Sequence, residues 1–101
     1  MAKGRQEQER LIEAWWEHRN AVLAFTDLAE IVPDAARVAD SAWASMHETF
    51  FRVLEAGASG IPVKTRWGDG LVTRITTDDK VEVYFSEDLR VTVHLAAINP
   101  R

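Results

Sequence analysis

The chain has no cysteine among its 101 residues. It can therefore form neither a disulfide framework nor a thiolate metal site, and three histidines alone seldom build a zinc centre. We expect a reducing compartment, no metal and no cofactor. The chain also lacks an apolar run near its beginning, since residues 1–10 are polar and charged. This favours a cytoplasmic protein without a signal peptide or a membrane span.

Basic residues are not in excess either. The net charge is −4, and it is unevenly placed: residues 1–60 hold six Lys/Arg against ten Asp/Glu, whereas residues 61–101 hold six of each. Counterion release by Lys and Arg supplies much of the affinity of nucleic-acid binders. Direct nucleic-acid binding is therefore possible but not favoured, and a protein partner is the first expectation.

No catalytic arrangement can be recognised in the sequence. It contains no cysteine nucleophile, no Gly-x-Ser-x-Gly elbow and no phosphate-cradling glycine loop. We expect a protein that is not an enzyme and has no catalytic residue. Hydrophobic residues make up 47% of the chain, enough for a packed core.

The first half of the chain predicts two helices, at about residues 6–30 and 34–57. Apolar residues recur there at steps of three and four, which is the period of an amphipathic helix. Pro33 interrupts the pattern, and Asp34 can cap the second helix. Gly57 and Gly60 end that helix and leave a linker at residues 58–60. The domain expected from this half is residues 1–57.

Two arms of nearly equal length with a short break favour an antiparallel helical hairpin. Positions whose numbers add to about 65 should then face each other. The expected pairs are Leu11 with Leu54, Trp15 with Phe50, and Val22 with Trp43. The hairpin leaves three apolar residues in need of another surface: Trp16, Leu23 and Phe51. A homodimer through a four-helix bundle would supply it.

After residue 60 the period changes to two, which is typical of half-buried antiparallel strands. Five short strands are expected, at residues 61–66, 71–76, 81–85, 91–95 and 97–98. Asp78-Asp79 and residues 86–88 have the chemistry of turns. Five strands in about forty residues favour a small closed barrel over residues 61–101. The predicted class is α+β, with a helical hairpin followed by a five-stranded antiparallel β-barrel.

A glycine-rich turn, Trp67-Gly68-Asp69-Gly70, precedes the second of these strands. Together with residues 63–66, 71–72, 81–85 and 95–98, it resembles the Tudor-like C-terminal domain of UvrD/PcrA-type helicases. The resemblance covers residues 61–98 and implies an SH3/Tudor-like barrel that docks onto nucleic-acid machinery without catalysis. This turn is expected to lie near the beginning of the barrel, with Trp67 packed across the barrel's mouth.

Strand alternation places polar side chains on the outer face of the barrel. The expected partner-binding residues are Arg74, Tyr84, Arg90 and His94, since an aromatic side chain flanked by arginines can clamp a carboxylate or stack on a base. Glu82 and Thr92 share that face. The interpretation is a bacterial or phage adaptor that contacts a protein of nucleic-acid machinery.

An alternative gives the binding role to the acidic helices. Glu13, Glu17 and Glu48 could imitate a phosphate row and occupy a basic groove, as in a phage-encoded anti-defence decoy. A second alternative would pair His18 with His47 and a neighbouring carboxylate as a metal site. A seam histidine is more often a packing residue, so no metal ligand is expected.

Overall fold

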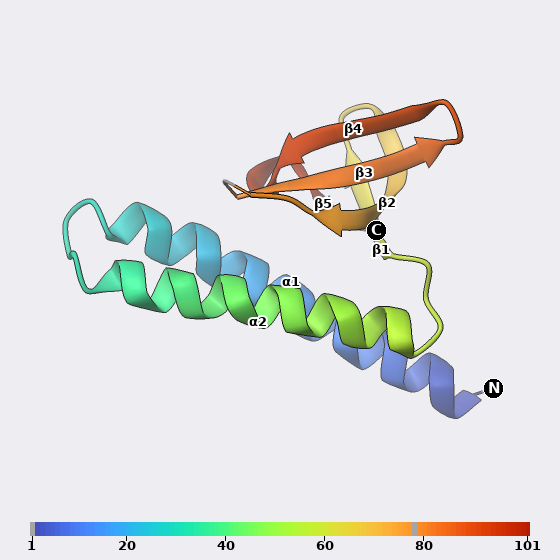
Figure 1. Cartoon of the computed structure of the whole chain (residues 1–101), viewed down its shortest axis with the longest axis horizontal. Helices are drawn as coiled ribbons and strands as arrows, with labels where there is room; N and C mark the ends of the chain where they lie inside the picture. The colour runs from blue at the N-terminus through green and yellow to red at the C-terminus, as the bar shows by residue number, and fades with distance from the viewer. Residues whose placement is uncertain (1, 78) are drawn as a thin grey trace. The chain divides into compact units, whose positions relative to one another are not determined.

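The computed structural model of the chain describes residues 2–77 and 79–101 and contains two helices followed by five strands (Figure 1). One of the two turn aspartates expected from the sequence, Asp78, lies outside these residues. The chain divides into two compact units, one ending at Gly57 and the other beginning at Ala58. We call them the helical unit and the sheet unit. The fold class is α+β, and no helix in the described ranges is long and apolar enough to cross a membrane.

The helical unit is an antiparallel pair of helices, α1 (Ala2–Leu28) and α2 (Ala35–Glu55) (Figure 1). Both stretches lack proline and contain several alanine, glutamate and arginine residues, which have high helix propensity. The helix ends agree with the sequence prediction to within four residues. The connection turns tightly, because the backbone N–H groups of Ile31 and Val32 both donate to the carbonyl of Leu28, at 3.0 and 2.8 Å.

One side-chain hydrogen bond fixes the register of the hairpin. Gln8 Nε2 donates to the carbonyl of Ala56 at 2.7 Å, and their numbers add to 64. The predicted register is therefore correct to within one residue. The predicted pairing of Leu11 with Leu54 does not bury both side chains, since Leu54 is 36% exposed.

The two ends of α2 differ in how well the sequence predicted them. Asp34 occupies the N-cap position, but it has helical backbone angles and its side chain makes no capping hydrogen bond, so the predicted cap is wrong. At the other end Gly57 has φ +99°, and its N–H donates to the carbonyl of Leu54 at 3.0 Å. Glycine adopts this left-handed conformation without the steric cost of a side chain, as predicted for the end of the helix.

Buried apolar side chains follow one stripe on each helix. On α2 the stripe consists of Ala35, Ala39, Ala42, Met46, Phe50 and Val53. On α1, Trp15 is fully buried and Val22 is 1% exposed. Trp16, for which the sequence predicted a need of further cover, is also buried. Phe51 is 59% exposed, and its ring meets the edge of the Phe50 ring, with 6.1 Å between centroids.

The sheet unit is one five-stranded antiparallel sheet in the order β4-β3-β2-β1-β5. Its strands are β1 (Ile61–Thr65), β2 (Gly68–Ile75), β3 (Lys80–Ser86), β4 (Leu89–His94) and β5 (Asn99–Pro100). The predicted number of strands is correct. The last strand comes later than predicted, because Leu95–Ala97 form a short 3-10 helix, η1.

The sheet is open in its strand pairing, whereas the sequence predicted a closed barrel. Among the described residues β4 and β5 occupy the two edges and pair only with β3 and β1. The physical reason is the length of β5: its two residues pair with Val63 and Lys64 and offer no second ladder. Register shifts between Val72 and Arg74 and between Tyr84 and Ser86 bend the long strands.

Alternation along the strands builds the core of the sheet unit. The buried side chains are Ile61, Val63, Val72, Val81, Val83, Val93, Leu95 and Ile98. Each strand residue between two of these faces the other way. The sheet therefore has one apolar face and one outer face, as the period of two predicted.

The turn that opens β2 is formed by Arg66 and Trp67, not by the glycines that follow them. Thr65 pairs with Gly68 across the hairpin, which leaves a two-residue loop between them. Gly68 has φ +120°, a conformation open chiefly to glycine. Gly70 lies inside β2, where an added Cβ would come within 2.7 Å of Val83 Cγ1 and 2.9 Å of the carbonyl of Tyr84. Gly68 is thus required by its backbone conformation, and Gly70 by the close packing of β2 against β3.

Candidate binding surfaces

The register of the sheet brings the four predicted binding residues to one face. Arg74 lies opposite Glu82, which lies opposite Thr92. Tyr84 lies opposite Arg90, and Lys80 lies opposite His94. We define the outer sheet face by the polar residues that share this side of β2, β3 and β4: Arg74, Lys80, Glu82, Tyr84, Arg90, Thr92 and His94. Alternation predicted Glu82, Tyr84, Arg90, Thr92 and His94 correctly; Lys80 was not predicted, and Arg74 reaches this face through the register shift after Val72.

Tyr84 and Arg90 form the pair of the outer sheet face nearest the β3–β4 turn. The guanidinium carbon of Arg90 lies 5.8 Å from the centroid of the Tyr84 ring, within the range of a cation–π contact. Tyr84 is half-buried, whereas Arg90 is exposed. The arginine is therefore held over the ring by a contact that leaves its charge accessible to a partner.

His94 has a structural contact that the sequence did not predict. It occupies the N-cap position of η1, and its Nδ1 accepts a hydrogen bond from the backbone N–H of Ala96 at 3.0 Å. This bond orients the exposed ring. Because Nδ1 is used as the acceptor, Nε2 is the ring nitrogen that can contact a partner.

The same register segregates charge on this side of the sheet. Alternation continues the outer sheet face into β1 and the start of β2, where Lys64 lies opposite Asp69. The basic residues on this side are Lys64, Arg74, Lys80 and Arg90, and the acidic residues are Asp69 and Glu82. The chain as a whole carries a net charge of −4, so this side of the sheet has the opposite sign. Such a surface favours an acidic partner.

Trp67 does not pack across the sheet as the sequence predicted. It is 52% exposed and lies at the tip of the β1–β2 hairpin, where the paired strands have already ended. The guanidinium carbon of Arg66 lies 4.5 Å from the centroid of its ring. The prediction was wrong because a residue in a two-residue loop projects beyond the core that the strands enclose.

The acidic residues of the alternative site are all exposed. Glu13 and Glu17 lie one turn apart on α1. Glu48 lies on α2, where its carboxylate accepts a hydrogen bond from Arg52 Nη2 at 2.8 Å. This ion pair partly neutralises Glu48, so the two α1 glutamates carry most of the negative charge of the proposed acidic surface.

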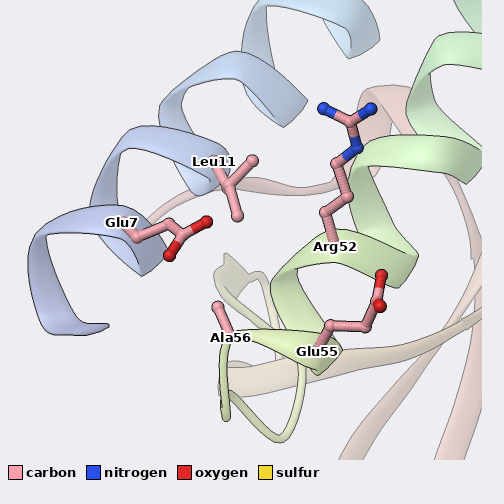
Figure 2. Close-up of a pocket in the computed structure, with 5 residues that line it drawn as sticks. All are labelled: Glu7, Leu11, Arg52, Glu55 and Ala56. Carbon is pink, nitrogen blue, oxygen red and sulfur yellow. The ribbon is translucent and has the colours of Figure 1, made fainter.

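A hollow of about 350 Å³ lies where the ends of the helical hairpin meet. Figure 2 shows Glu7 and Leu11 projecting from α1 toward the side of α2 that carries Arg52, Glu55 and Ala56. Its lining is mixed, with two carboxylates and one guanidinium around a single leucine. Arg52 is already bonded to Glu48, so the hollow adds no separate charged site to the two surfaces above.

Arg19 is a buried charged residue that the sequence analysis missed. It is 8% exposed, and its guanidinium carbon lies 4.7 Å from the centroid of the Trp16 ring. Its Nε donates to Asn20 Oδ1 at 2.8 Å. Burial lowers the pKa of Arg19, because removal from water disfavours the charged form. Its position one turn after Trp15, on the apolar stripe of α1, was the signal available in the sequence.

The histidines of the helical unit gain no support as metal ligands. The ring of His47 contacts the edge of Trp43, with 5.1 Å between centroids. Within the described residues, no three side chains of histidine, aspartate or glutamate gather closely enough to hold a metal ion.

Comparisons with protein-family models, with curated proteins and with solved structures find no significant match to the chain. The function must therefore be argued from the chemistry of its surfaces.

Proposed function

We propose that the chain is a non-catalytic binding module of the bacterial or phage cytoplasm. In this proposal its outer sheet face docks onto an acidic surface of a protein component of nucleic-acid machinery. The observation that supports it is the register, which gathers Arg74, Tyr84, Arg90 and His94 on one side of the sheet. Tyrosine and arginine are enriched among residues that dominate binding energy, and complementary charge guides association.

We further propose that the sheet unit is of the SH3/Tudor-like type. Strands β1 to β4 form a meander, β5 returns to pair with β1, and two register shifts bend the sheet. The sequence resemblance to the C-terminal domain of UvrD/PcrA-type helicases points the same way. Because such small sheets leave little room for a substrate pocket, this type supports docking over catalysis.

The alternative function is that of an acidic decoy. It rests on Glu13 and Glu17, which are exposed one turn apart in the half of the chain that carries the excess of negative charge. A basic groove on another protein, such as a nuclease, would be the target. Glu48 would add to this surface from α2.

Partner capture by purified variants separates the two functions. We expect the double substitution Tyr84→Ala and Arg90→Ala to weaken capture of the native partner by about 2 kcal/mol or more, because both side chains are of the type that anchors interfaces. Glu13→Lys with Glu17→Lys should leave capture unchanged, and Arg5→Ala serves as a control for the loss of an exposed arginine. Affinity capture from the native host, read by mass spectrometry, measures how much partner is retained by the parent chain, the two double variants and Arg5→Ala. The opposite pattern would replace the adaptor with the decoy.

A homodimer through the helical unit is a separate proposal. Phe51 is 59% exposed and Leu54 is 36% exposed on α2, and burying them against a second copy would be favourable. We expect light scattering to give a dimer mass that falls toward the monomer mass on dilution and after Phe51→Ser. A mass of one chain at every concentration would rule the dimer out.

A further inference from the structure

The tip of the β1–β2 hairpin presents an indole to solvent. Trp67 is 52% exposed, whereas Trp15 and Trp16 on α1 are buried. Tryptophan is highly buried on average, because its large apolar surface is costly to leave in water. The exposed position therefore needs a reason other than packing.

The loop that carries Trp67 is held in place by Thr65. The Oγ1 atom of this threonine accepts a hydrogen bond from the N–H of Trp67 at 3.1 Å and donates one to the carbonyl of Gly68 at 2.9 Å. Thr65 and Gly68, which flank the two-residue loop, also form the last pair of the hairpin. The backbone that carries the indole is therefore fixed before a ligand binds, which lowers the ordering cost of binding.

Positive charge surrounds the tip. The guanidinium of Arg66 lies over the Trp67 ring, with its carbon 4.5 Å from the centroid. Lys64 precedes it on β1, and Arg101 donates a hydrogen bond to the carbonyl of Gly70 on β2. In the β1–β2 hairpin and the last three residues of the chain, Asp69 is the single acidic residue. Glu87 and Asp88 lie in the β3–β4 turn, so an anionic ligand would follow the β1–β2 side.

We propose that Trp67 and Arg66 form a stacking site for single-stranded nucleic acid. A base stacks on the indole face that Arg66 leaves uncovered, while Arg66 and Lys64 contact the flanking phosphates. Every base has a π-face, so such a site is tolerant of sequence. The neighbours of Trp67 in the loop are Thr65, Arg66 and Gly68, so the ring lies beside a cation and polar groups, as in sites that stack a base and contact its phosphates. This site goes beyond the docking function and does not depend on it.

The test titrates the full-length chain into a fluorescein-labelled short oligothymidylate and follows anisotropy, with tryptophan fluorescence as a second readout. We expect saturable binding tighter than about 1 mM at low salt, with quenching of the tryptophan signal. Trp67→Ala should weaken binding about tenfold or more, whereas Trp67→Phe should keep most of the affinity. Arg66→Ala should reduce the slope of log affinity against log salt by about 0.7.

The controls distinguish stacking from general attraction to phosphates. Circular dichroism should be unchanged by Trp67→Ala, since the side chain lies outside the core. A duplex of the same length should bind more weakly, because its bases are already stacked. No binding below about 1 mM, equal binding of duplex and single strand, or an affinity that Trp67→Ala leaves unchanged would each overturn the site. Those results leave the docking function intact, because its test uses Tyr84 and Arg90 and a protein partner.

Discussion

Replacing Gly60 with alanine is expected to destabilise the sheet unit by about 3 kcal/mol or more. An added Cβ would lie 2.3 Å from the carbonyl oxygen of Val72, and a backbone atom of β2 cannot move without disturbing its ladder. Gly70→Ala should cost about 1–3 kcal/mol, because its Cβ would meet Val83 Cγ1 and the carbonyl of Tyr84. Native-state hydrogen exchange of the β2 and β3 amides measures both losses.

Gly4→Ala is the matched control for these substitutions. Gly4 lies in α1, and an added Cβ would meet no atom within 4 Å. Alanine is favoured over glycine in a helix by up to about 1 kcal/mol, so this change should stabilise the helical unit slightly and leave exchange in the sheet unchanged. If Gly60→Ala and Gly70→Ala, like Gly4→Ala, kept the parent's exchange rates in β2 and β3, the close packing around the two sheet glycines would be contradicted.

The second large effect is expected at Trp15. This side chain is fully buried, and its ring meets the edge of Trp16 with 5.0 Å between centroids. Trp15→Ala should lower the free energy of unfolding by about 3–5 kcal/mol, because a large cavity replaces the indole. Urea unfolding followed by the helical circular dichroism signal measures this loss.

Trp15→Phe separates the packing of this ring from its polar group. The indole Nε1 of Trp15 is buried and donates no hydrogen bond to the part of the chain that the structure describes. A buried donor without an acceptor is destabilising, and phenylalanine removes it while keeping an aromatic ring. We expect a loss of about 1.5 kcal/mol or less, clearly smaller than for alanine. Equal losses for the two variants would contradict this interpretation of the site.

Periodicity was sufficient to predict the helical hairpin and the number of strands. Steps of three and four along α1 and α2 reflect the face that each helix buries, and the hydrogen bond from Gln8 to Ala56 confirms the register inferred from arm lengths. The change to a period of two located β1 to β4 for the same reason. What periodicity could not give was closure, because that depends on the length of β5, a segment too short to show a period.

The environment of single residues was harder to predict. Trp67 was expected to pack across the mouth of the barrel, but its burial depends on which residues form the loop. The pairing of Thr65 with Gly68 decides that, and it is a tertiary property of the hairpin. Arg19 was missed for the converse reason: a charged residue is rarely buried, and its stacking on Trp16 depends on side-chain geometry.

The members of the outer sheet face on β3 and β4 were largely predictable, whereas their contacts were not. Alternation alone places Tyr84, Arg90 and His94 on one side, because side chains two apart share a face. The cap that His94 provides to η1 could not be foreseen, since the sequence suggested a strand in place of that 3-10 helix. The bend between Val72 and Arg74 was equally invisible, because a register shift needs both strands to be known.

Site-specific photo-crosslinking tests the central claim most directly. A photoreactive amino acid replaces Thr92, an exposed residue of the outer sheet face, or Glu17 on α1, and the chain is irradiated in its native host. The docking proposal predicts that the Thr92 probe captures one protein of nucleic-acid machinery and that the Glu17 probe does not. Capture from position 17 alone would contradict it and favour the acidic decoy.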